Sequence, residues 1–161
     1  MKSLVLYYSR SGHTRKLAQE IAAALSADIE ELKDGRNRSG PIGFLKSGRE
    51  ARSGATVDLA PLSHNPSQYD LVVVGTPVWA STISSPVRTL LQHESLRGVK
   101  LAWFCTSGAT SSSMHNGCLN DMSHESGHTP VAMLGLSAGE LRGDHSKKVA
   151  DFANSARAAV G

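Results

Sequence analysis

Short apolar runs alternate with segments of helical periodicity along the whole chain. The apolar runs cover residues 3–8, 28–32, 70–75, 99–105 and 130–136. The first run leads through a polar turn into a segment with helical spacing, marked by Leu17, Ile21, Ala24 and Leu25. This alternation is typical of crossover units, which place their strands side by side in a parallel sheet. The chain has 161 residues, and we expect residues 1–161 to form a single α/β domain.

The third apolar run is the best candidate for the centre of the sheet. Four consecutive aliphatic residues, Leu71 to Val74, suit a strand that is buried on both faces. Helices are predicted for Thr14–Leu25, for Ser85–Leu91 with Pro86 early in it, for the segment holding Met114, Cys118, Leu119 and Met122, and for Ser146–Val160 with Ser146 as the N-cap. Residues 34–56 are rich in Gly, Arg and Ser, which predicts a loop around a short helix.

The composition and the apolar runs disfavour nucleic-acid-binding, membrane-spanning and secreted proteins. There are 17 Lys and Arg against 14 Asp and Glu, and the resulting net charge of +3 is too small to indicate a nucleic-acid partner. No apolar stretch approaches the ~20 residues of a membrane helix, so no membrane span is expected. The first apolar run is too short for a secretory signal, which makes the cytoplasm the expected location. Without export, Cys105 and Cys118 are interpreted as free thiols.

A cluster of histidines and one cysteine invites a metal interpretation. His115, Cys118, His124 and His128 lie close together in the sequence. Their spacing fits no compact zinc pattern, and a helix through this segment would scatter them around its axis. We therefore expect no metal site and interpret the group as polar surface plus a core thiol.

Three loops at the carboxyl ends of predicted strands carry the chemistry, because ligands of open parallel sheets bind at that edge. The first loop leads into a helix N-terminus and offers backbone and hydroxyl donors to an anion such as phosphate. The second puts an indole beside a proline, where an exposed ring could stack on a flat ligand; the alternative is that the indole folds back into the core. The third could line the polar edge of such a ring. These loops are Ser9-Arg10-Ser11-Gly12-His13-Thr14, Thr76-Pro77-Val78-Trp79-Ala80-Ser81 and Thr106-Ser107-Gly108-Ala109-Thr110-Ser111.

Better-known phosphate sites are excluded by missing residues. There is no G-x-x-x-x-G-K-[ST] loop and no G-x-G-x-x-G after the first strand, which excludes a Walker loop and disfavours a Rossmann dinucleotide fold. Cys105 has no Arg in the eight residues that follow it, so a phosphatase loop is not supported. A receiver domain is excluded because it needs a phosphoacceptor Asp at the end of a strand. Here the first strand ends in Tyr8-Ser9 and the third in Gly75-Thr76. The remaining possibility is a loop that binds a phosphate group without transferring it, which indicates a bound phosphorylated cofactor.

The three loops together resemble the flavodoxin family. Its phosphate loop, [ST]-x-[ST]-G-x-T, is matched by Ser9, Ser11, Gly12 and Thr14, and the run from Tyr69 to Trp79 resembles its third strand and flavin-stacking loop. The resemblance covers essentially the whole chain. It implies a flavodoxin-like three-layer sandwich with a five-stranded parallel sheet in the order 2-1-3-4-5 that binds FMN noncovalently.

The resemblance also implies which residues hold the cofactor. The first loop would hold the ribityl phosphate, Trp79 would stack on the flavin, and the third loop would touch its polar edge. No catalytic side chain is implied, because the redox chemistry belongs to the flavin. The cofactor-binding residues are then Ser9, Arg10, Ser11, Gly12, His13, Thr14, Pro77, Val78, Trp79, Ala80, Thr106, Ser107, Gly108 and Ala109.

Three departures from the family pattern bear on the kind of redox protein. Electron-carrier flavodoxins are strongly acidic, whereas this chain is at +3. The third loop lacks the Tyr that covers the flavin in many carriers, and Ala80 replaces the Gly that often follows the aromatic residue. Three hypotheses stay open: electron transfer to a redox partner protein, an FMN-dependent oxidoreductase that reduces a small acceptor such as a quinone, and a non-redox phosphate-ligand-binding module on the same fold.

Overall fold

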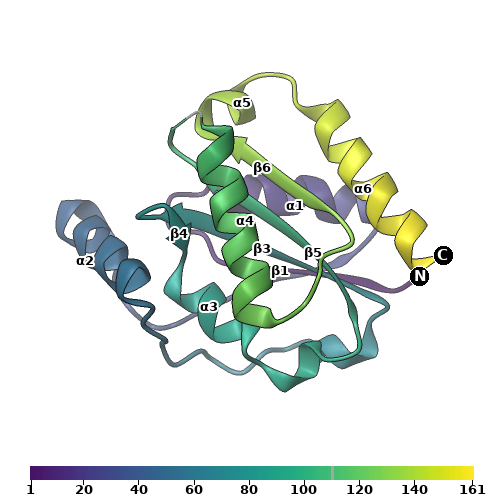
Figure 1. Cartoon of the computed structure of the whole chain (residues 1–161), viewed down its shortest axis with the longest axis horizontal. Helices are drawn as coiled ribbons and strands as arrows, with labels where there is room; N and C mark the ends of the chain where they lie inside the picture. Colours follow the sequence, from purple (N-terminus) through teal and green to yellow (C-terminus); the bar gives the residue numbers. More distant parts are fainter. Residues whose placement is uncertain (110) are drawn as a thin grey trace.

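The computed structural model describes residues 1–109 and 111–161, so Thr110 of the third loop lies outside the described residues. Figure 1 shows a central sheet with helices packed around it. The strands are β1 (Ser3–Tyr7), β2 (Asp28–Glu31), β3 (Leu71–Trp79), β4 (Thr82–Ile83), β5 (Lys100–Ser107) and β6 (Met133–Ser137). The α-helices are α1 (His13–Leu25), α2 (Gly40–Ser53), α3 (Ser85–Leu91), α4 (Ser112–Ser126), α5 (Ala138–Arg142) and α6 (Ser146–Val160), with short 3-10 turns at Pro66–Gln68 and Glu94–Leu96.

The sheet confirms the predicted fold class. Its strands run in the order β2-β1-β3-β5-β6, and every pair along this path is parallel. With β4 left aside, this is the predicted 2-1-3-4-5 order. The difference is β4, which pairs antiparallel with the end of β3 through Val78↔Ile83 and Trp79↔Thr82. The second loop is therefore a hairpin, and its Pro77, Val78 and Trp79 belong to a strand.

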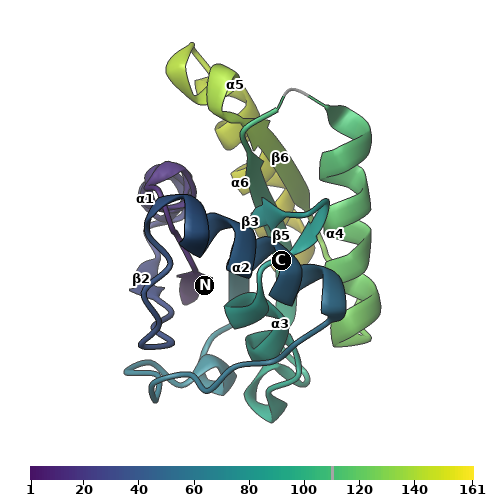
Figure 2. The same cartoon turned by 90° about the vertical axis from the view of Figure 1, so that its left-hand side faces the viewer.

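Helices cover both faces of the sheet, as Figure 2 shows with α1 on one side and α4 on the other. Alternate residues of the central strands feed the two cores because side chains alternate across a strand. On the α1 and α6 side lie Val5, Val73 and Phe104, and on the α3 and α4 side lie Leu4, Val72 and Trp103, all fully buried. No helix among the described residues is long and apolar enough to span a bilayer.

Gly75 shows how tightly one core is packed. A Cβ built on this residue would lie 1.9 Å from Cζ of Phe104, a fully buried ring on the neighbouring strand. The ring fills the space that any larger residue at 75 would need. Gly75 and Phe104 pair across β3 and β5, so this close contact lies a few residues before the edge of the sheet where the loops emerge.

Three sequence-based expectations were wrong in detail. Helix α2 has 14 residues and is not short; Figure 1 shows it standing apart from the other helices at one end of the molecule. The N-cap of α6 is His145, while Ser146 is its first residue and donates a hydrogen bond from its hydroxyl to Asp144. Helix α5 was not expected; it begins with a capping box in which Ser137 and Glu140 satisfy each other's backbone N–H.

Candidate functional site

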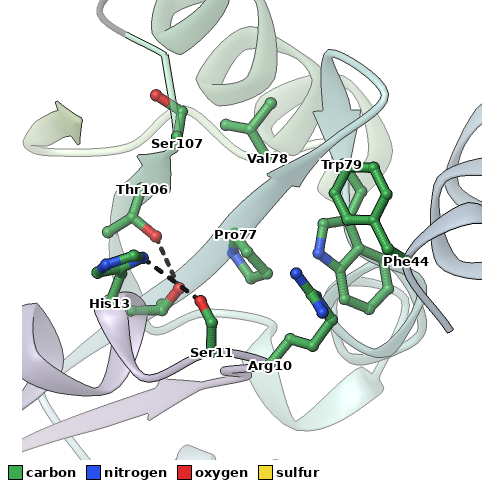
Figure 3. Close-up of a pocket in the computed structure, with 11 residues that line it drawn as sticks. Arg10, Ser11, His13, Phe44, Pro77, Val78, Trp79, Thr106 and Ser107 are labelled. Atoms are coloured by element: carbon green, nitrogen blue, oxygen red, sulfur yellow. Dashed lines mark hydrogen bonds between the residues drawn. The ribbon is translucent and has the colours of Figure 1, made fainter. Parts of the chain in front are cut away.

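The three loops meet in one pocket because β1, β3 and β5 are adjacent and parallel, so their carboxyl ends share one edge. The pocket has a volume of about 310 Å³. Figure 3 shows its residues, with Ser11 and His13 of the first loop at one end and Phe44 and Trp79 at the other. The lining residues are Arg10, Ser11, His13, Thr14, Phe44, Pro77, Val78, Trp79, Thr106, Ser107 and Gly108.

The first loop leaves the N-terminus of α1 ready for an anion. Gly12 caps the helix with φ of 102°, a conformation that other residues rarely adopt, and its N–H donates to Ser9 Oγ at 3.1 Å. The N-cap glycine has no side chain with which to cap the helix, and the first turn holds no acidic residue. The N–H groups of that turn have no partner within the helix, so a phosphate could accept hydrogen bonds from them.

A buried hydrogen bond joins the first loop to the third. Thr14 Oγ1 and Thr106 Oγ1 lie 2.8 Å apart, and both residues are buried. Thr14 belongs to the first turn of α1 and Thr106 to the end of β5. The bond fixes the helix N-terminus against the sheet edge, which holds the two walls of the pocket at a set separation.

Trp79 lies in the second loop, but it is not the exposed ring that the sequence suggested. Only 5% of its surface is accessible. Tyr8 packs against it in a T-shaped arrangement with ring centroids 5.5 Å apart, and the guanidinium carbon of Arg38 lies 4.9 Å from its ring centroid. The indole still lines the pocket. Its neighbours hold it in place, so it can offer a ligand a fixed surface.

Arg38 is a residue that sequence reasoning missed. Its guanidinium is buried and makes hydrogen-bonded ion pairs with Asp34 at 2.7 Å and with Glu50 of α2 at 2.7 Å. It also donates to Ser47 Oγ at 3.0 Å. Burial alone would lower the pKa of Arg38, but the bonds to the two carboxylates outweigh it and raise the pKa. Arg38 thereby joins α2 to Trp79 as a permanent cation.

The third loop is held from below by a buried histidine. Ser107 Oγ donates to the carbonyl of Ala109 at 2.6 Å and lies 2.6 Å from His115 Nε2. Because the hydroxyl has one proton, both contacts are satisfied only if the imidazole donates from Nε2. Burial lowers the pKa of His115, so the neutral ring is favoured. A Cβ at Gly135 would lie 2.5 Å from the His115 Cβ, so this glycine makes the space for the histidine.

Most of the predicted residues come together in the pocket. Those that do not line it are Ser9, Gly12, Ala80 and Ala109, which shape the loops. Phe44 lines it without having been predicted. The available signal was an aromatic residue within a short apolar stretch, Ile42 to Leu45, of a segment that is otherwise rich in Gly, Arg and Ser. Arg10 lies with its guanidinium carbon 5.3 Å from the centroid of that ring.

The suspected metal ligands are not brought together. Within residues 1–109 and 111–161, no group of three or more His, Cys, Asp or Glu could hold a metal ion. One part of that interpretation was wrong, because His115 is buried and does not belong to the polar surface. Cys105 and Cys118 are free thiols, as interpreted, and both are buried.

Comparisons with known proteins agree with this geometry. The sequence model of the NADPH-dependent FMN reductase family matches residues 1–150. No curated protein matches significantly. Among solved structures, a proposed flavoprotein from Bacteroides eggerthii DSM 20697 superposes with a TM-score of 0.79 at 21% identity, over 97% of this chain and 98% of that one.

Two further structures share the fold. A flavoprotein from Lactobacillus acidophilus NCFM, solved in complex with FMN, superposes with a TM-score of 0.64 at 24% identity, over 88% of this chain and 96% of that one. Oxidised flavodoxin 2 from Bacillus cereus superposes with a TM-score of 0.63 at 18% identity, over 99% of both chains. At these identities the likeness concerns the fold.

Proposed function

Because this chain belongs to the NADPH-dependent FMN reductase family, we propose that it is an FMN-dependent oxidoreductase that passes electrons to a small acceptor such as a quinone. The observation that carries the proposal is the single pocket in which the three loops meet. Its electron donor is proposed to be NADPH, as the family description states. We also propose that the protein is cytoplasmic and that residues 1–161 form one domain.

The residues of the pocket fit FMN. The uncapped N-terminus of α1 offers N–H donors for the phosphate, with Ser11 and Thr14 beside it and no acidic residue in the first turn. Trp79, Pro77 and Val78 supply an apolar wall for the flavin ring. Gly108 and Ser107 of the third loop would face its polar edge, and Gly108 has open space where a side chain would be.

FMN, when bound, supplies an electron acceptor and donor that no side chain can replace. The protein contributes binding and orientation. The Thr14–Thr106 bond and the His115–Ser107–Ala109 chain fix the walls before a ligand arrives. Arg38 and Tyr8 hold Trp79, so little side-chain freedom is lost on binding.

A specific observation separates the proposal from its nearest alternative. An electron carrier docks on a partner protein through complementary charge, and the carriers that this chain resembles are acidic. This chain carries +3, and its basic residues Lys46, Arg49 and Arg52 lie on α2, next to the pocket. The charge does not suit docking of that kind and leaves a small acceptor as the better candidate, with electron transfer to a protein as the second candidate.

A flavin titration tests the proposal. Purified protein is titrated with FMN, FAD and riboflavin while flavin fluorescence is followed, and bound FMN is then reduced without oxygen by NADPH. FMN should bind, riboflavin should bind far more weakly because it lacks the phosphate, and NADPH should reduce the complex. If folded protein binds no flavin, the phosphate-ligand module becomes the leading hypothesis; if FMN binds but NADPH does not reduce it, the carrier does.

A further inference from the structure

A second cavity lies beside the flavin pocket, between α2 and the turn after Trp79. Its volume is about 420 Å³, within the range of small-molecule sites. Phe44 lines both cavities, so the two adjoin along this ring. The walls consist of Phe44, Leu45, Gly48, Arg49, Arg52 and Ala80. We call this cavity the α2 groove.

The groove combines apolar surface with unpaired positive charge. Phe44 is 59% exposed and Leu45 is 70% exposed, which is unusual for such large apolar side chains. Within the described part of the chain, the side chains of Arg49 and Arg52 have no ion-pair or hydrogen-bond partner. By contrast, Arg36 and Arg38, from the same basic segment, are paired with carboxylates. The groove therefore offers a flat apolar contact and two guanidinium groups that lack an anion.

A second copy of the chain is a poor occupant. A two-fold interface on this face would bring the same patch of both copies together, so the positive charges of Arg49 and Arg52 would be doubled at the contact. A flat molecule with one anionic substituent satisfies both features, because its ring covers Phe44 and Leu45 while the anion meets the guanidinium groups. The position of the groove beside the flavin pocket suits a molecule that exchanges electrons with the flavin.

We infer that the α2 groove binds the anionic substituent of an aromatic redox substrate, and that Arg49 and Arg52 make the chain select anionic acceptors over neutral ones of the same shape. The inference rests on the proposed function, because it assigns the groove to a substrate of the flavin. Arg49 and Arg52 are then residues of substrate specificity, and they take no part in holding FMN.

The test compares two ligands of nearly equal shape. Anthraquinone-2-sulfonate carries a negative charge and anthraquinone-2-sulfonamide is neutral. Each is titrated by calorimetry into protein saturated with oxidised FMN, so that binding is measured without electron transfer. The Arg49→Gln/Arg52→Gln variant should bind the sulfonate about 3- to 30-fold more weakly, as expected for two partly solvated ion pairs. Its affinity for the sulfonamide should change less than about twofold.

A matched control removes the same charge elsewhere. Arg97 and Lys100 are exposed, lie near the start of β5 and line neither cavity. The Arg97→Gln/Lys100→Gln variant should bind both ligands as the parent does. Added salt should weaken binding of the sulfonate by the parent protein and leave the sulfonamide unaffected.

Several results would overturn the inference. The first is an unchanged affinity of the Arg49→Gln/Arg52→Gln variant for the sulfonate. The second is an equal loss of affinity of that variant for both ligands. The third is a loss of affinity for the sulfonate in the control variant that equals the loss in the Arg49→Gln/Arg52→Gln variant. A stable dimer by light scattering that is broken by Phe44→Asp would assign the groove to a second copy instead. Titrating every variant with FMN distinguishes failure of the proposed function from failure of the inference about the α2 groove. If the parent protein binds no FMN the proposed function fails, whereas normal FMN binding with no charge selection refutes the groove alone.

Discussion

Replacing Arg38 by Met should destabilise the fold strongly. The side chains of Arg38 and Asp34 are 5% and 3% exposed, so the substitution leaves a carboxylate buried without its cation. Breaking such a pair typically costs about 3–5 kcal/mol. For a chain of this length, ~1 kcal/mol corresponds to about 2–4 °C in Tm, which gives an expected decrease of about 6–20 °C. The contact between Arg38 and Trp79 is lost as well, so FMN should bind more weakly.

Urea unfolding followed by circular dichroism measures the effect, with FMN absent so that binding does not add to the stability. Arg36→Met is the matched control, because Arg36 is 51% exposed and pairs with Glu50, one of the partners of Arg38. It should cost at most about 1 kcal/mol. The double variant Arg38→Met/Asp34→Asn should recover part of the loss, since the buried charge is gone. If Arg38→Met costs no more than the control, or the double variant recovers nothing, the cluster is not the buried ion pair described above.

Four further outcomes are expected. Trp79→Ala should weaken FMN binding by about 1–3 kcal/mol in a fluorescence titration, and an unchanged affinity with an intact fold would remove this ring from the site. Gly135→Ala should cost about 1–3 kcal/mol in urea unfolding because the added methyl group collides with the histidine beneath the third loop, and a neutral result would mean that the loop has room to shift. The hydrogen bond to Glu20 raises the pKa of His145. The stabilisation of the fold by this pair should therefore be complete below the unfolded pKa near 6.5 and be lost as pH rises through the raised pKa. The His145→Gln variant should lack this pH dependence when the free energy of unfolding is measured from pH 5 to 9. The hydrogen bond to the neighbouring thiol and burial raise the pKa of Cys118, so a thiol reagent such as dithionitrobenzoate should react with native protein far more slowly than with protein in urea, and equal rates would contradict the buried state.

The elements that were predicted correctly have local signals. The aliphatic run at the start of β3 and the helical spacing in α1 and α6 follow directly from side-chain periodicity. The phosphate loop is local as well, because six consecutive residues carry its donors and its glycine. The strand order and the set of cofactor-binding residues, by contrast, were implied by the resemblance to the flavodoxin family that these local motifs carry.

The features that were missed depend on contacts between distant segments. Strand β4 has two residues, and its turn uses Ala80 and Ser81 with φ of 49° and 66°, where Asn and Gly are the usual signal. Arg38 looks like any surface arginine until Asp34 and α2 close around it. His115 was placed on the surface because its helix position says nothing about the space that a glycine on β6 leaves for it.

The order of the strands has a consequence for how the protein is made. Strand β1 is synthesised first, but its partner β3 follows far along the chain, with Leu4 pairing to Val72. At ~5–20 residues per second, the ribosome needs about 3–14 s to deliver that partner. During this time only β2 is available to pair with β1, so the other edge of β1 stays unpaired. Val5 and Leu6 of this strand are fully buried in the folded protein but are exposed at this stage. A nascent chain halted before residue 71 should therefore stay bound to a chaperone. The chaperone should dissociate when β3 emerges from the exit tunnel.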